Sequence, residues 1–298
     1  MNVIIDSDFG VDDTFCIEYM LNLHNSQKCN ILGITTVCGN IKAKNAYLSG
    51  KYIFKNIFKS DIDVFYSPES SQNDNRCNYF YGEDGHYDII KNNTDYNLYN
   101  YDKISSVQFM LNKLNNCNNI TIIAIGPLTN LSECERIQPG ILSKAKQILI
   151  MGGAVNVPGN ITKKAEYNFY IDPNAIIPVI KNNNVVIFPL DITLNVKYSY
   201  DQLVKKFSNS NFYKYIINGM YKQEILTNEI PENSNYVIIH DPITALYFEN
   251  PGKFLVNKDV VNIDKTDGNI FISKHGYDVS IAYKLADNNL VHNFTNKI

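Results

Sequence analysis

Positive charge is not in excess in this sequence. The 27 lysines and arginines are outnumbered by 30 aspartates and glutamates, so the formal net charge is −3. Proteins that hold a nucleic-acid backbone present a basic surface to its phosphates, so this balance argues against nucleic acid as a partner. Hydrophobic residues make up 45% of the chain and charged residues 19%, which is typical of a soluble globular protein with a large core.

Long apolar segments and paired cysteine motifs are also missing. No window reaches the apolar length of a membrane span, and the first residues run into a strand pattern without the basic region of a secretory signal. We therefore expect a cytoplasmic protein that does not engage a membrane. The six cysteines form no C-x-x-C pair, which predicts reduced, structural thiols and argues against a metal cluster.

Short apolar runs alternate with helix-like stretches along the chain. Runs rich in Val and Ile indicate strands buried on both faces, and they are Val3–Ile5, Ile31–Val37, Ile120–Ala124, Ile148–Met151 and Val185–Leu190. The predicted helices are Asp12–His24, Ile104–Leu114, Pro173–Lys181 and Asp241–Glu249. This alternation predicts an α/β fold with an open, mostly parallel, doubly wound (Rossmann-like) sheet flanked by helices.

The chain shows no repeat and no linker, so we expect a single domain that covers residues 1–298. Two segments, Ser67–Asn78 and Ser208–Asn235, are interpreted as excursions from the core. Loops longer than about a dozen residues in a compact domain often bind ligands or act as lids. We therefore predict one domain with mobile insertions.

Acidic residues cluster directly after the first predicted strand. Asp6, Asp8, Asp12 and Asp13 lie within eight residues, at a strand-to-helix turn where such sheets bind ligands. These carboxylates repel one another unless something compensates, and a hard divalent cation does so because it takes oxygen ligands. The density of acids favours a metal site over the alternative of a helix cap with solvated acids.

Further motifs follow in order along the chain. They are Gly33-Ile34-Thr35-Thr36-Val37-Cys38-Gly39-Asn40, Gly82-Glu83-Asp84-Gly85, Gly126-Pro127-Leu128-Thr129-Asn130, Met151-Gly152-Gly153-Ala154, Ala165-Glu166-Tyr167-Asn168-Phe169-Tyr170-Ile171-Asp172-Pro173 and His240-Asp241-Pro242. Together with the acidic opening, they closely resemble the inosine-uridine-preferring nucleoside hydrolase family. The chain departs from the family at Phe9, where a proline is usual, and at Tyr81, where many members have a histidine.

The resemblance implies a glycosidase that hydrolyses the N-glycosidic bond of purine or pyrimidine ribonucleosides to ribose and free base. It implies a homodimer or homotetramer that acts in nucleoside catabolism and purine salvage. It also implies a Ca²⁺ ion held by Asp8, Asp13, Asp241 and the backbone carbonyl of Ile125, with Asp8 as the general base that activates a Ca²⁺-bound water. Asp6 is interpreted as structural. The preferred nucleobase, purine or pyrimidine, stays open.

The remaining site residues come from the same resemblance, in which Asp12 grips the ribose 2′- and 3′-hydroxyls. The predicted substrate-binding residues are Asp12, Asn40, Tyr81, Met151, Asn160, Glu166, Asn168 and Asp241. Independently of the family, Glu166 and Asn168 are expected to share one face of an extended segment. His240 is the predicted acid for the departing base, because an ordinary histidine titrates near pH 6.5. Its alternative interpretation is a buried, hydrogen-bonded core histidine.

Two other functions remain open at this point. An Asp-x-Asp pair after a first strand also occurs in Mg²⁺ phosphatases of the haloacid dehalogenase type. Such an enzyme would need a lysine and a second acidic pair after a later strand, and Asp191-Ile192-Thr193 is a poor substitute. The other alternative is a non-catalytic ribonucleoside-binding protein, but all the expected metal-binding carboxylates are present.

Overall fold

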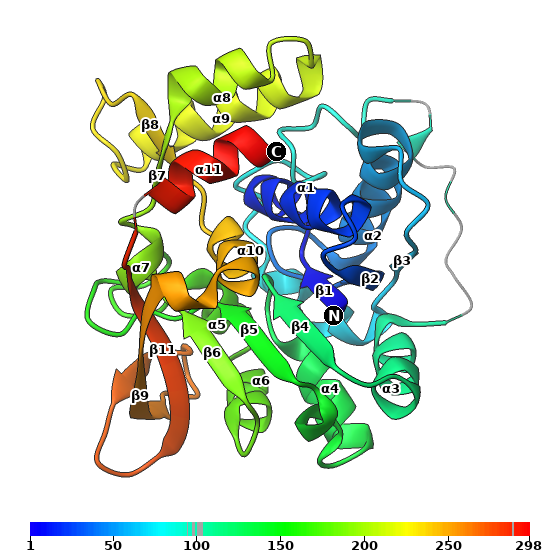
Figure 1. Cartoon of the computed structure of the whole chain (residues 1–298), viewed down its shortest axis with the longest axis vertical. Coiled ribbons are helices and arrows are strands. Elements are labelled where there is room, and N and C mark those ends of the chain that lie inside the picture. The colour runs from blue at the N-terminus through cyan, green and yellow to red at the C-terminus, as the bar shows by residue number, and fades with distance from the viewer. Residues whose placement is uncertain (94, 97–98, 100–103, 288) are drawn as a thin grey trace.

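The strand β1 (Asn2–Ser7) lies inside the parallel part of a large twisted sheet. The structure is a computed structural model, and it describes residues 1–93, 95–96, 99, 104–287 and 289–298. Within the described residues the strand order is β10-β9-β11-β6-β5-β4-β1-β2-β3 (Figure 1). The other strands of this sheet are β2 (Asn30–Thr36), β3 (Val64–Phe65), β4 (Ile120–Ala124), β5 (Gln147–Met151), β6 (Val185–Phe188), β9 (Phe254–Ile263), β10 (Ile270–Ile272) and β11 (Tyr277–Leu285).

The ladder is mostly parallel, as predicted. Strands β6, β5, β4, β1, β2 and β3 pair in parallel, and β11 pairs in parallel with β6. Strands β9 and β10 extend this edge in antiparallel orientation. Because β1 has β4 on one side and β2 on the other, the strand order reverses at β1. A crevice opens beyond the carboxyl ends of the strands at such a point.

Helices cover both faces of the sheet (Figure 1). Their bounds are α1 (Val11–Asn25), α2 (Ala43–Tyr52), η1 (Ile53–Phe58), η2 (Pro68–Arg76), α3 (Ser106–Asn116), α4 (Thr129–Ile137), η4 (Ile141–Lys144), α5 (Tyr167–Ile171), α6 (Pro173–Ile180), α7 (Leu190–Thr193), α8 (Tyr200–Lys206), α9 (Asn211–Leu226), α10 (Pro242–Glu249), η5 (Pro251–Lys253) and α11 (Asn289–Lys297). Successive side chains of a strand point to opposite faces of the sheet, so the core is divided into two clusters. Val3 and Ile5 pack in one cluster with α1 and α10, whereas Ile4 packs in the other with α3, α4 and α6.

A smaller layer lies beside this sandwich. Strands β7 (Lys197–Ser199) and β8 (Tyr236–Ile238) pair in antiparallel orientation, and α8 and α9 lie next to them at one end of the molecule (Figure 1). None of the helices within the described residues has both the length and the apolar character that crossing a membrane requires.

Some of the expected elements need correction. The segment Ser208–Asn235 is predicted to be a loop, yet most of it is the helix α9, whose buried Phe212, Ile216 and Met220 recur every four residues. The predicted excursion Ser67–Asn78 is largely the 3₁₀ helix η2. The predicted strand Val185–Leu190 ends at Phe188, because α7 begins directly after Pro189.

Strands β9, β10 and β11 are not predicted at all. Each of them mixes buried positions with exposed or half-buried ones, and Leu255, Phe271 and Ile272 are exposed. Uninterrupted apolar runs predict only strands that are buried on both faces, so they do not indicate β9, β10 and β11.

Candidate active site

The base of the site is a hydrogen-bonded cluster around Asp6. One carboxylate oxygen of Asp6 accepts hydrogen bonds from Thr35 Oγ1 and from Asn130 Nδ2, both at 2.7 Å. The Asn130 amide also donates to the carbonyl of Thr36 at 2.8 Å. These bonds join the ends of β1 and β2 to the start of α4. The other Asp6 oxygen is buried without a hydrogen-bond partner, and burial raises the pKa of Asp6 to about 7.

The turn after β1 holds Asp8 in place. One oxygen of the buried Asp8 carboxylate accepts a hydrogen bond from the Asn40 N–H at 2.6 Å. Gly39 permits this approach, because a Cβ at that position would lie 2.0 Å from the carboxylate. Phe9 adopts a φ of 52°, which a proline cannot, so the turn differs locally from one built on proline. The departure at Phe9 leaves the carboxylates at the site.

Three further aspartates meet at this turn. Asp13, in the first turn of α1, accepts hydrogen bonds from Ser7 Oγ at 2.6 Å and from the Gly10 N–H at 2.9 Å. Asp241 is the residue before α10. Asp12, Asp13 and Asp241 each offer a carboxylate oxygen, and these atoms all lie within 4.8 Å of one another. Of the predicted metal-binding carboxylates Asp8, Asp13 and Asp241, this group contains Asp13 and Asp241, and it has Asp12 in place of Asp8.

The crowded carboxylates need compensation. Burial raises the pKa of the Asp8 carboxyl to about 7, and burial together with the charges of its neighbours raises the pKa of Asp13 and of Asp241. The second carboxylate oxygen of Asp8 is buried without a hydrogen-bond partner. An oxygen-only set of buried acids with an unsatisfied oxygen fits a hard divalent cation, which would hold these groups in their ionised form.

A second group of residues comes from the chain after β5. Glu166 is expected in an extended segment, but it is the residue that caps α5, and its carboxylate accepts from the N–H groups of Asn168, Gly153 and Phe169. Glu166 and Asn168 therefore do not share one face of an extended segment, contrary to the prediction from the sequence. Glu166 and Asn168 still line the same pocket, because the helix turn brings them together. Asn160 accepts a hydrogen bond from the Tyr167 N–H at 2.9 Å on the same side.

The carboxyl ends of β4 and β5 are tied together by one amide. Asn168 Nδ2 donates to the carbonyl of Ile125 and to the carbonyl of Met151, both at 3.2 Å. The Ile125 carbonyl, which is predicted to bind the metal, is thus held in place by Asn168. Ile125 and Met151 both line the pocket.

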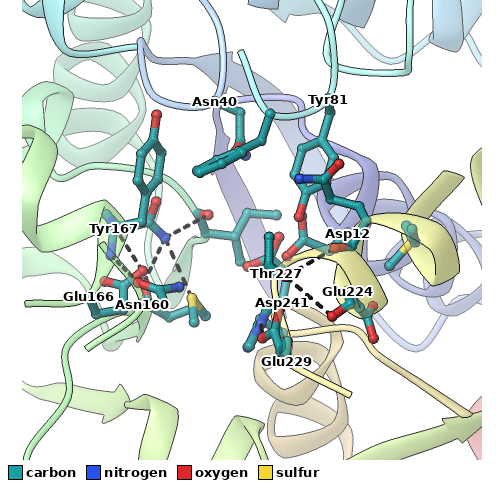
Figure 2. Close-up of a pocket in the computed structure, with 17 residues that line it drawn as sticks. Asp12, Asn40, Tyr81, Asn160, Glu166, Tyr167, Glu224, Thr227, Glu229 and Asp241 are labelled. Carbon is teal, nitrogen blue, oxygen red and sulfur yellow. Dashed lines mark hydrogen bonds and ion pairs between the residues drawn. The ribbon is translucent and has the colours of Figure 1, made fainter. Parts of the chain in front are cut away.

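These residues surround one pocket with about 840 Å³ of empty space, part of it open to solvent. Figure 2 shows Asn160, Glu166 and Tyr167 on one side and Asp12, Tyr81 and Glu224 on the opposite side. The predicted residues that line it are Asp12, Asn40, Tyr81, Ile125, Met151, Asn160, Glu166, Asn168, His240 and Asp241. The buried Asp8 and Asp13 lie outside this lining. Tyr81 packs edge to face on Tyr87, with ring centroids 5.6 Å apart.

His240 is partly buried and has specific partners. Its Nε2 lies 3.2 Å from Glu229 Oε1, and its Nδ1 lies 2.8 Å from Thr193 Oγ1. Burial lowers the pKa of His240, but the hydrogen bond and charge of Glu229, with the charges of Asp12 and Glu224, outweigh burial and raise it to about 9. The ring is therefore an imidazolium at neutral pH. Each of its N–H groups then donates to one of these two partners.

Seven pocket residues are missing from the sequence-based set. They are Phe80, Tyr167, Met220, Gln223, Glu224, Thr227 and Glu229. Met220 and Gln223 on α9 and Thr227, which directly follows it, lie three and four positions apart and so face the pocket together. This helical spacing is visible in the sequence, but only the fold shows that it faces the site. Burial raises the pKa of Glu224 to about 8, although its carboxylate accepts from the Ile238 N–H.

The comparisons with known proteins agree with this geometry. Residues 3–292 match the model of the family described as inosine-uridine preferring nucleoside hydrolase. The chain belongs to this family. The hydrolase is 27% identical to uridine nucleosidase 1 of Arabidopsis thaliana over 267 residues, which cover 88% of this chain and 78% of the relative. It is 29% identical to the pyrimidine-specific ribonucleoside hydrolase RihB of Escherichia coli, with 64% of this chain and 60% of the relative covered.

Solved structures show the same fold. A plant nucleoside hydrolase, the PpNRh1 enzyme, superposes with a TM-score of 0.85 at 23% identity and covers 99% of this chain and 98% of its own. A purine-preferring ribonucleoside hydrolase from Gardnerella vaginalis gives a TM-score of 0.84 at 20% identity, covering 100% and 98%. Family membership over nearly the whole hydrolase excludes the phosphatase alternative. Nucleoside hydrolases generally bind a metal ion, and this one has an aspartate-rich site for it.

Proposed function

We propose that this nucleoside hydrolase cleaves the N-glycosidic bond of ribonucleosides with Asp8 as the general base. One observation carries the proposal. The Asp8 carboxylate is fully buried beside Asp12, Asp13 and Asp241, with one oxygen fixed by Asn40 and the other unpaired. A carboxylate held this way serves as a proton acceptor at the edge of a substrate pocket. Asp8 would accept the proton of the attacking water at its unpaired oxygen.

The resident cofactor we propose is Ca²⁺. Asp8, Asp13, Asp241 and the carbonyl of Ile125 would hold it. Asp12 would share the site, because its carboxylate oxygen lies within 4.8 Å of those of Asp13 and Asp241. All of these donors are oxygens, and Ca²⁺ takes six to eight oxygen ligands in flexible geometry. When bound, the cation lowers the pKa of water and compensates the clustered carboxylates. Asn168 keeps the Ile125 carbonyl in position through its amide.

The substrate's ribose would lie between the two groups of polar residues. Asp12 is placed to accept hydrogen bonds from the vicinal hydroxyls, while Asn40, Asn160, Glu166 and Asn168 line the surrounding wall. Cleavage builds oxocarbenium character on the sugar. Carboxylate and amide oxygens that are fixed before the reaction stabilise this positive charge without reorganising. Met151 supplies an apolar surface against the sugar.

The departing base would receive its proton from His240. The imidazolium carries a proton on Nε2, shared with Glu229 Oε1, and another on Nδ1, directed at Thr193. Transfer from Nε2 leaves Nδ1 fixed by Thr193, so the ring keeps its position. Tyr81 lines the same side of the pocket and would contact the base.

A direct assay tests this proposal. The purified protein with added Ca²⁺ is incubated with a panel of purine and pyrimidine ribonucleosides, including inosine and uridine, and with p-nitrophenyl phosphate. We expect equal amounts of free base and ribose from at least one ribonucleoside, and no nitrophenolate. Ribonucleosides that bind in calorimetry but release no base would overturn the proposal in favour of a non-catalytic binding protein.

A further inference from the structure

Two cysteines that are distant in sequence meet beside the pocket. The sulfur atoms of Cys38 and Cys77 lie 3.0 Å apart although the residues are 39 positions apart in the chain. Cys38 follows β2 and is fully buried, while Cys77 ends η2 and is half-buried. Both are free thiols in the structure. One sulfur is thus within reach of solvent and in direct contact with the other.

The segments that carry these thiols are already bridged without a covalent bond. The hydroxyl of Tyr167 donates a hydrogen bond to the carbonyl of Gly39 at 2.9 Å and accepts one from the Asn78 N–H at 3.4 Å. Gly39 directly follows Cys38, and Asn78 directly follows Cys77. The fold therefore holds the two cysteine backbones next to each other independently of the thiols.

Both segments continue into the pocket wall. Asn40 lies two residues after Cys38, and Phe80 and Tyr81 lie three and four residues after Cys77. We propose that Cys38 and Cys77 are a site of reversible disulfide formation that ties the Asn40 segment to the Tyr81 segment. This site lies outside the residues that carry out the proposed hydrolysis.

The reaction is an exchange with a small disulfide such as oxidised glutathione. The half-buried Cys77 attacks as a thiolate, forms a mixed disulfide and releases one glutathione thiol. Cys38 then attacks the sulfur of Cys77 and releases the second, so two protein thiols are oxidised as one glutathione disulfide is reduced. The hydrogen bond to Cys77 and burial raise the pKa of Cys38, so the second step is slow at neutral pH.

A metal ion is the competing occupant. Asp74, Cys38 and Cys77 offer ligand atoms that lie within 4.8 Å of one another. Structural zinc sites use four ligands, usually cysteine or histidine, and this group supplies three among the described residues. The direct sulfur–sulfur contact favours the disulfide.

The test uses the full chain. The protein is reduced, freed of reductant, incubated with oxidised glutathione at pH 8.5 and mapped by mass spectrometry of non-reduced peptides. We expect a Cys38–Cys77 cross-link with the loss of two hydrogen atoms, reversed by dithiothreitol. We also expect the melting temperature to rise by roughly 5 °C, because a bridge across such a loop constrains the unfolded chain.

Variants separate this site from the other thiols. Cys117→Ser, which removes a half-buried cysteine elsewhere, should form the same bridge with the same thermal shift. Cys77→Ser and Cys38→Ser should each abolish both. A glutathione adduct on Cys77 without the cross-link would overturn the proposal. So would stoichiometric zinc in the purified protein that is lost in Cys77→Ser. None of these measurements depends on the proposed hydrolysis.

Discussion

The pairing of His240 with Glu229 makes the protonation of the departing base testable. Burial lowers the pKa of His240, but the hydrogen bond and charge of Glu229, together with the charges of Asp12 and Glu224, raise it to about 9, so the imidazolium is present below that pH and is lost as the pH rises through it. Glu229→Gln keeps the shape of the side chain and removes its charge. The pKa of His240 should then return towards its ordinary value of about 6.5.

The size of the effect follows from these two values. At pH 8, about nine-tenths of the wild-type rings are protonated, whereas a ring that titrates near 6.5 is only about one-thirtieth protonated. We therefore expect kcat for a natural nucleoside to fall by about 30-fold at pH 8 in Glu229→Gln. At pH 6 most rings are protonated in both proteins, so the loss should shrink to about 1.3-fold.

The assay compares two leaving groups across this pH range. A nucleobase leaves poorly as an anion and needs the proton, whereas the nitrophenolate of p-nitrophenyl riboside does not. The synthetic riboside should therefore show little loss, and the ratio of the two losses removes shared effects on folding or ribose binding. Glu232→Gln removes the charge of an exposed neighbouring residue and is the matched control. It should leave kcat for both substrates unchanged. An equal, pH-independent loss on both substrates would refute the reasoning and leave Glu229 a structural role.

Three further predictions concern the base, the metal and the fold. Asp8→Asn should lower kcat by at least about 10²-fold with little change in melting temperature, and a variant with near wild-type kcat would rule out Asp8 as the base. Exhaustive chelation should abolish activity and lower the melting temperature, because a ligand that binds only the folded state stabilises it; full activity in protein shown by elemental analysis to be metal-free would contradict this. Burial opposes ionisation of Glu249, but hydrogen bonds from Lys28, Lys297 and Tyr19 lower its pKa to about 2, so its contribution to stability is present above pH 4.5 and is lost as the pH falls towards 2. Glu249→Gln should therefore lower the melting temperature by roughly 1–3 °C at pH 7 and by much less near pH 2, whereas an equal shift at both values would rule out the ion pairs as its cause.

Sequence alone determined the parallel half of the sheet and the acids at its edge. Buried parallel strands need apolar side chains on both faces, so β1, β2, β4, β5 and β6 are continuous Val- and Ile-rich runs that stand out in the sequence. The carboxylates that follow β1 are close together in the chain itself. They come together at the site as long as a helix follows β1, and the pattern from Asp12 onwards predicts that helix.

Tertiary structure decided the rest of the pocket. Glu224, Glu229 and Thr227 belong to a segment that has no strand of the main sheet, and only the packing of α9 brings them to face Asp12. The local conformation of Glu166 was likewise decided by its surroundings, because its carboxylate binds the N–H of Gly153 as well as those of its own helix.

The state of His240 shows the physical reason most directly. Nothing in the His240-Asp241-Pro242 motif indicates whether the ring is neutral or charged. Its charge depends on Glu229, eleven residues earlier, together with Asp12 and Glu224, which the fold brings near the ring. Burial and long-range contacts set the pKa of a side chain, and neither is local in the sequence. The sequence therefore predicts which residue types take part in the chemistry. Their protonation states and their partners are set only when the chain is folded.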